Sequence, residues 1–317
     1  SVGLFVLTVA SLPVWILPTY RPPTLNREPE PAKYDMQPLD VSYGDALRLL
    51  GYDIKTQEVQ PGEPIKFRLL WQTISATADP HSIFIHVLGQ EERIVTQRDA
   101  YPGRGLMSTT QLAHGATWIE NYAISIPVMA YTPDTLALRV GVYNTANGAR
   151  LPITNENNEQ SEVTLGSIAM PSQKTHIPNP LEIRFGHGIV LQGYELDGLS
   201  VEQDETLAVT LYWACESPVD DDYTVSVQLL DAQWRKASQS DEWPQNGAAP
   251  TSSWKAGQRI TEKRHLDIAP DAAPNVYDLQ IALYRINETG ELVHLPIVWH
   301  KGQMPSQSVT LTRIRVK

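Results

Sequence analysis

The segment 65–71 reads IKFRLLW, and the segment 207–213 reads LAVTLYW. In each segment apolar residues recur at every second position and the run ends on a tryptophan, so one side of an extended strand faces a core. The two segments are offset by 142 residues. We therefore predict that Trp71 and Trp213 are buried packing residues at equivalent places in a repeated β unit.

The same offset relates residues 43–143 to residues 185–284, with a slip of one residue at the end. It pairs Gly51-Tyr52 with Gly193-Tyr194, and it pairs an Asp-x-x-Pro-x-x-Gly element at 99–105 with another at 241–247. A fixed offset over so long a stretch indicates one structural unit used twice. The sequence thus predicts the same strand order in both copies.

Short alternating runs separated by turn signals, without strong helical periodicity after residue 40, predict an all-β fold. We expect two tandem β-sandwich domains, immunoglobulin-like or jelly-roll-like, at 41–169 and 183–317. The polar segment 170–182 is the linker between them. In the closing run 309–316, the apolar phase switches at Arg313, which predicts a bulge.

The first residues bear on location. Residues 2–17 read VGLFVLTVASLPVWIL and contain no charged residue. This uncharged run approaches the length of a membrane-spanning helix. We predict that 1–17 is the final part of a transmembrane helix; a signal anchor and a buried apolar strand are the alternatives. The proline-rich segment 18–40 is expected to be a semi-rigid linker. The β-domains would then be membrane-anchored and extracytoplasmic, in the cell envelope.

Composition narrows the function classes. The chain has 317 residues and a formal net charge of −11, without a run of Lys and Arg, which argues against nucleic acid as a partner. The single cysteine, Cys215, follows Trp213 in a strand-like run and is expected to be a buried thiol. Metalloprotease, nucleophile-elbow and phosphate-binding glycine motifs do not occur in the sequence. We predict no catalytic residue, no metal site and no cofactor.

The repeated Asp-x-x-Pro-x-x-Gly element contains the candidate site residues. Asp99 and Asp241 each follow a strand-like run. One interpretation is an Asx turn, in which the carboxylate caps backbone amides and Pro and Gly complete the loop. The other is a ligand loop, because the residue before Pro is Tyr101 in one copy and Trp243 in the other. An aromatic ring presented in a loop can stack on a sugar.

Further aromatics and polar clusters lie near this element. Trp254 and Trp234 would widen an aromatic platform in the second copy. The acidic run at 220–222 lacks the spacing of a calcium loop and is expected to be a solvated loop. His86 lies inside a strand-like run and is expected to be packed or on the surface, without a metal.

The order of these motifs resembles a known arrangement. Gly51-Tyr52, a Pro-Gly-Glu turn at 61–63, Leu69-x-Trp71, the 99–105 element and a turn at 148–151 follow one another. This resembles the β-rich extracytoplasmic regions after the last membrane helix of bacterial polytopic proteins similar to dolichyl-phosphate-mannose-protein mannosyltransferases. The resemblance implies catalysis in a membrane part outside this chain, so no catalytic residue carries over.

Three functions therefore stay open. The first is a membrane-tethered binding or accessory module for a glycan or a partner protein. The second is the C-terminal portion of a membrane glycosyltransferase, with a lipid-linked sugar as ligand. The third is a structural subunit of an envelope membrane complex, with a membrane-protein partner.

Overall fold

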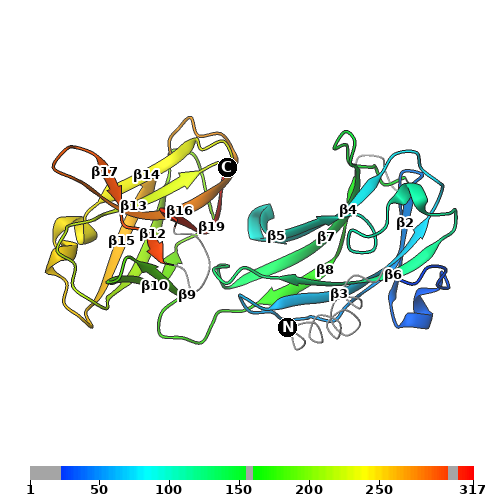
Figure 1. Ribbon diagram of the computed structural model, residues 1–317, viewed down its shortest axis with the longest axis horizontal. Coiled ribbons are helices and arrows are strands. Elements are labelled where there is room, and N and C mark those ends of the chain that lie inside the picture. Colours follow the sequence, from blue (N-terminus) through cyan, green and yellow to red (C-terminus); the bar gives the residue numbers. More distant parts are fainter. Residues whose placement is uncertain (1–22, 155–159, 299–305) are drawn as a thin grey trace, which may run out of the picture.

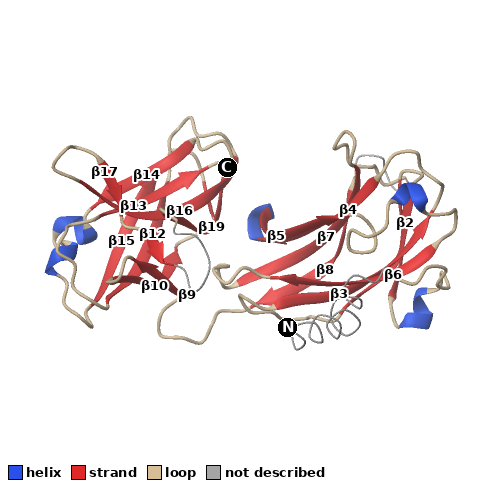
Figure 2. Ribbon diagram, in the orientation of Figure 1, coloured by secondary structure: helices blue, strands red, loops and turns tan. Residues whose placement is uncertain are grey.

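The computed structural model describes residues 23–154, 160–298 and 306–317. The predicted membrane segment at 1–17 lies outside these ranges. Within them, no helix is long and apolar enough to cross a membrane. Figure 2 shows that strands dominate the described chain and that its helices are short. The fold is all-β, as the alternating sequence pattern predicted.

The first half of the chain, from residue 37 to residue 170, forms two four-stranded antiparallel sheets (Figure 1). One has the strand order β1-β2-β3-β6 and the other has β5-β4-β7-β8. The strands are β1 (Gln37–Tyr43), β2 (Leu47–Ile54), β3 (Pro64–Thr73), β4 (His81–Gly89), β5 (Arg93–Ala100), β6 (Thr117–Ser125), β7 (Asp134–Asn144) and β8 (Glu162–Met170).

The second half, from residue 180 to residue 316, repeats this order as β9-β10-β12-β15 and β14-β13-β16-β19, so the predicted common topology is confirmed. Three short strands are added: β18 pairs with β9, β11 with β19, and β17 with β16. The strands are β9 (Pro180–Phe185), β10 (Ile189–Leu196), β11 (Ser200–Val201), β12 (Thr206–Cys215), β13 (Thr224–Leu230), β14 (Lys236–Glu242), β15 (Arg259–Asp267), β16 (Asn275–Ile286), β17 (Leu292–His294), β18 (Ile297–Val298) and β19 (Ser308–Val316).

The helices of the described residues are single 3-10 turns that sit in loops. They are η2 (Pro31–Tyr34), η3 (Gln90–Glu92), η4 (Thr109–Gln111), η5 (Pro244–Gly247) and η6 (Thr251–Ser253). Two element boundaries fall earlier than the sequence suggested. β1 begins at Gln37, inside the expected linker 18–40, and β9 begins at Pro180, inside the expected linker 170–182.

Each half encloses its own hydrophobic core, built from the inward residues of its two sheets. Trp71 and Trp213 are 0% and 1% exposed, which confirms their prediction as packing residues. Trp71 lies beside Tyr43, with ring centroids 6.0 Å apart, and Trp213 lies beside Phe185 at 5.7 Å. Cys215 is buried as expected, and burial raises the pKa of its thiol.

The predicted bulge in the closing strand is present. The register between β16 and β19 shifts between Leu279 and Gln280, which pair with Thr312 and Thr310. The shift turns Val309, Leu311, Ile314 and Val316 all toward the core, although they do not alternate in the sequence.

The two halves meet along β5 and β19 (Figure 1). Arg93 and Asp134, both almost fully buried, form an ion pair at 2.8 Å in the first half. Arg93 Nη1 also donates to the backbone oxygen of Arg313, and Arg313 Nη1 donates to the backbone oxygen of Ile94 at 2.7 Å. The charged pair therefore holds a junction that extends into the last strand.

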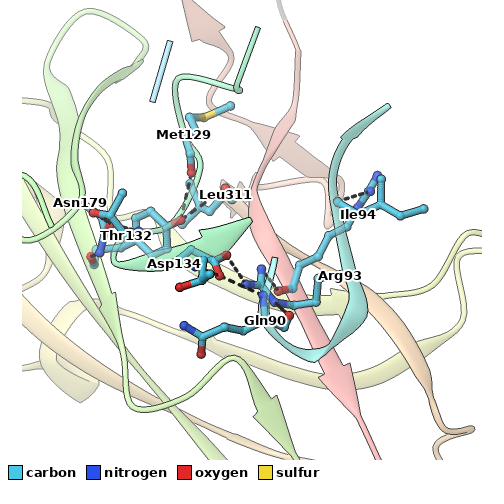
Figure 3. A network of polar contacts seen from close by, with 11 residues as sticks. Gln90, Arg93, Ile94, Met129, Thr132, Asp134, Asn179 and Leu311 are labelled. Carbon is cyan, nitrogen blue, oxygen red and sulfur yellow. Dashed lines mark hydrogen bonds and ion pairs between the residues drawn. The ribbon is translucent and has the colours of Figure 1, made fainter. Parts of the chain in front are cut away.

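A second set of contacts closes the junction, and Figure 3 shows both sets together. Asn179 Oδ1 accepts hydrogen bonds from Thr132 N at 2.6 Å and Thr132 Oγ1 at 2.9 Å. Tyr194 Oη donates to the backbone oxygen of Met129 at 3.1 Å. Met129 and Tyr131 pack against the core of the second half. Buried polar groups with their partners in place define one arrangement of the two halves.

Candidate binding surface

Asp99 and Asp241 lie inside β5 and β14, not in the loops that follow. Both carboxylates are exposed. Asp241 accepts a hydrogen bond from Tyr284 Oη at 3.1 Å and another from the Gln239 amide. The expectation of Asx turns is therefore wrong for Asp241, because its side chain contacts other side chains on the sheet.

The capping role belongs to two buried glutamates that the sequence interpretation missed. Glu120 Oε1 accepts from Arg104 N at 2.6 Å, and Oε2 accepts from Gly103 N at 3.2 Å. Glu262 Oε2 accepts from Gln245 N at 3.3 Å. Glu120 and Glu262 are equivalent under the 142-residue offset. In each half, a buried carboxylate thus holds the Pro-x-x-Gly loop by accepting hydrogen bonds from its backbone.

The predicted aromatic platform does not exist as proposed. Trp254 is 2% exposed and its Nε1 donates to the backbone oxygen of Ala249, so it is a core residue. Trp243 is 46% exposed and Tyr101 37%, so both are available in their loops. Trp234 is 72% exposed and lies before β14, whereas Trp243 lies directly after it.

Trp234 instead borders a hollow on the outer face of the second half's sheet. The hollow has a volume of about 240 Å³. Neighbouring strands place their outward residues in rows: Ser226 of β13 pairs with Ala282 of β16, and Ala282 pairs with Ser308 of β19. The next row joins Gln228 and Gln280. The hollow is lined by Ser226, Gln228, Leu230, Trp234, Gln280, Ile281, Ala282, His294, Gln307 and Ser308.

Amide and hydroxyl groups dominate this surface, and they form hydrogen bonds with one another. Gln228 Nε2 donates to Ser226 Oγ at 2.7 Å, and Ser308 Oγ donates to Gln280 Oε1 at 3.3 Å. His294 Nδ1 is a buried atom without a hydrogen-bond partner among the described residues. A neutral surface with fixed donors and acceptors and one unpaired nitrogen suits a neutral ligand rich in hydroxyl groups.

The equivalent face of the first half is filled. Phe84 occupies the position equivalent to Ser226. Its cross-strand partner is Gly141, whereas the partner of Ser226 is Ala282. A Cβ on Gly141 would collide with the Phe84 ring, so the glycine makes room for it. The Arg150 guanidinium lies 4.5 Å from the centre of the Phe84 ring.

Charged side chains complete this cover. Glu162, the counterpart of Ser308, pairs with both Arg139 and Arg150 at 3.1 Å. His86 lies against Phe84, with ring centroids 4.8 Å apart, and burial lowers the pKa of its imidazole. His86 is therefore packed, as the sequence predicted. The two halves share a fold but differ on this face.

The acidic run at 220–222 is held by local contacts. Asp221 pairs with Arg285 at 3.1 Å, and Asp222 Oδ1 accepts from Ser252 N at 3.0 Å, so the 220–222 loop packs against η6. Across the residues that the structure describes, no group of three or more His, Cys, Asp or Glu is placed to hold a metal ion.

Comparison with known proteins does not extend this description. No protein-family model matches the chain, and no curated protein matches its sequence.

Proposed function

We propose that this chain is an extracytoplasmic binding module whose second half binds a neutral glycan on the outer face of β13, β16 and β19. The observation that carries the proposal is the difference between the halves. At register-equivalent positions the first half has Phe84 covered by Arg150, and the second half has Ser226 beneath an open hollow.

The chemistry of the hollow supports a sugar ligand. Amide groups of Gln228 and Gln280 both donate and accept, which matches the hydroxyl groups of a sugar ring. Trp234 offers a large exposed apolar face at the border, suited to stacking on the flat side of such a ring. Asp241 lies on the same face next to Ser226, and its charge favours a neutral glycan over an acidic one.

The strand order supports an immunoglobulin-like sandwich for each half over a jelly roll. When β2, β3 and β6 are taken as strands A, B and E, the facing sheet β5-β4-β7-β8 corresponds to C′-C-F-G. In this arrangement one face of the C′-C-F-G sheet points away from the core. It is this face that carries the hollow in the second half.

The apolar segment 2–17 supports a membrane tether for the module. A C-terminal position in a membrane glycosyltransferase remains the alternative that the sequence resemblance favours. The junction between the halves favours a structural role as well, since hydrogen bonds of Arg93 and Arg313 cross it.

A glycan array probed with the full chain tests the proposal. We expect retention of one or more neutral glycans. Trp234→Ala and Gln228→Ala should each weaken that binding by about tenfold or more, equivalent to about 1.4 kcal/mol. Trp243→Ala should weaken it less, since Trp243 does not line the hollow, and Tyr101→Ala in the first half should leave it unchanged. Equal retention of the same glycans by wild type and Trp234→Ala would contradict the proposal.

A further inference from the structure

A second hollow, of about 380 Å³, lies in the first half where the N-terminal segment crosses β3 and β6. Three arginines from separate parts of the chain line it: Arg27 before η2, Arg68 in β3 and Arg104 in the loop after β5. Thr24, Tyr34 and Asn121 add polar groups to its wall. In a chain with a net charge of −11, three guanidinium groups around one hollow are a local concentration of positive charge.

Of the three arginines, only Arg68 is paired with a carboxylate in the part of the chain that the structure describes. Arg68 is bound to Asp53 at 2.6 Å, and Asp53 is shared with Lys55. Glu120 lines the hollow, but its oxygens accept from the backbone nitrogens of Gly103 and Arg104. Among the described residues, neither Arg27 nor Arg104 forms an ion pair with a carboxylate.

The fold itself does not need arginine at these places. The second half has Thr210 where the first has Arg68, and Asn246 where the first has Arg104. Arg104 and Asn246 both adopt a left-handed backbone, with φ of 60° and 54°. Asparagine tolerates that conformation better than a long side chain does. Arginine at residue 104 therefore carries a conformational cost that asparagine at the same place would reduce.

We infer that this hollow, lined by Arg27, Arg68 and Arg104, is a binding site for a phosphate group. Guanidinium groups recognise phosphate oxygens through paired, charge-assisted hydrogen bonds, and arginine is the residue best suited to them. The phosphate can come from a free phosphate ester or from a lipid headgroup. The second source fits the sequence, because only five residues lie between Leu17 and Pro23. A fully extended chain of that length spans at most roughly 20 Å.

The first experiment measures binding of inorganic phosphate to the full chain in neutral detergent by isothermal titration calorimetry. The wild-type chain should show one saturable site. The double variant Arg27→Gln/Arg104→Asn, which places the second half's residue at 104, should bind about tenfold more weakly or worse. Arg259→Gln, an exposed arginine in the second half, is the matched control and should bind as wild type. Thermal unfolding confirms that the variants are folded.

The second arm distinguishes the sources. The full chain is placed in bilayer discs of phosphatidylcholine alone or with phosphatidylglycerol, and phosphate is titrated again. Weaker phosphate binding in the phosphatidylglycerol discs, seen for wild type and absent in the double variant, identifies the lipid headgroup. Equal binding in both discs identifies a soluble phosphate ester. Absence of saturable binding to wild type, or equal affinity of wild type and the double variant, would overturn the inference. Neither readout depends on glycan binding by the second half.

Discussion

Glu120 and Glu262 occupy the same position in β6 and β15, and each holds the Pro-x-x-Gly loop of its own half from within. Their surroundings differ. Glu120 accepts a further hydrogen bond from Trp118 Nε1 at 3.3 Å. Glu262 accepts from Trp213 Nε1 at 2.7 Å and pairs with the buried guanidinium of Arg264 at 3.0 Å. The repeat thus keeps the carboxylate and changes its partners.

Removal of Glu262 should destabilise the second half strongly. Glu262→Ala leaves the Arg264 guanidinium, whose side chain is 1% exposed, without its buried partner. We expect a loss of about 3–5 kcal/mol in the free energy of unfolding, measured by chemical denaturation. Glu242 also contacts Arg264 but is half exposed, so Glu242→Ala is the control and should cost below about 1 kcal/mol. Similar losses for both variants would contradict this assignment.

Glu120 should make stability depend on pH. Burial raises the pKa of this carboxyl group, so the folded chain holds the proton more tightly than the unfolded chain does. Its contribution to stability is therefore greatest below the unfolded pKa of about 4.3 and is lost as pH rises through the raised pKa. The difference in unfolding free energy between wild type and Glu120→Gln should fall over that range. A difference that rises with pH would have the wrong sign.

The two core tryptophans should respond differently to phenylalanine. Trp71 Nε1 has no hydrogen-bond partner in the described part of the chain, whereas Trp213 Nε1 donates to Glu262. Both substitutions remove similar volume, but only Trp213→Phe breaks a hydrogen bond to a buried carboxylate. We expect Trp213→Phe to cost more than Trp71→Phe, by about 1.5–3 kcal/mol, in urea unfolding. Equal costs would show that the Trp213–Glu262 contact contributes little.

The junction between the halves should depend on Asp134. Asp134→Ala leaves Arg93, which is 2% exposed, buried without a counter-charge. We expect a loss of about 3–5 kcal/mol in the free energy of unfolding, measured by thermal or chemical unfolding. The half-exposed pair of Asp221 and Arg285 in the second half provides the control, and Asp221→Ala should cost below about 1 kcal/mol. A mild effect of Asp134→Ala would mean that the junction is held elsewhere.

The repeat made the strand order and the core tryptophans predictable, because inward positions must stay apolar in both copies. The bulge in β19 was predictable from the phase switch of apolar residues at Arg313. Glu120 and Glu262 escaped notice because glutamate in a strand is ordinarily a surface residue. Their shared position was the available signal. Trp254 was misplaced for a related reason: its counterpart Leu112 is also buried, and that pairing indicated a core position.

Other features depend on contacts that a sequence does not display. Arg93 and Asp134 lie on different strands of the first half, and their ion pair depends on the packing of β5 and β7. The hollow beside Trp234 exists because the small Ser226 occupies the position that the Phe84 ring fills in the first half. The 142-residue offset pairs Phe84 with Ser226, but only the strand register shows that Gly141 and Ala282 lie opposite them.

The most direct test of the central claim exchanges this one face between the halves. In Ser226→Phe/Ala282→Gly, the second half receives the ring and the glycine that close the same face around Phe84 and Gly141. Calorimetric titration of a glycan retained on the array should give saturable binding to wild type and affinity weaker by about tenfold or more in the variant, with thermal unfolding showing a folded chain. Undiminished affinity in the folded variant would place the binding site elsewhere and contradict the account.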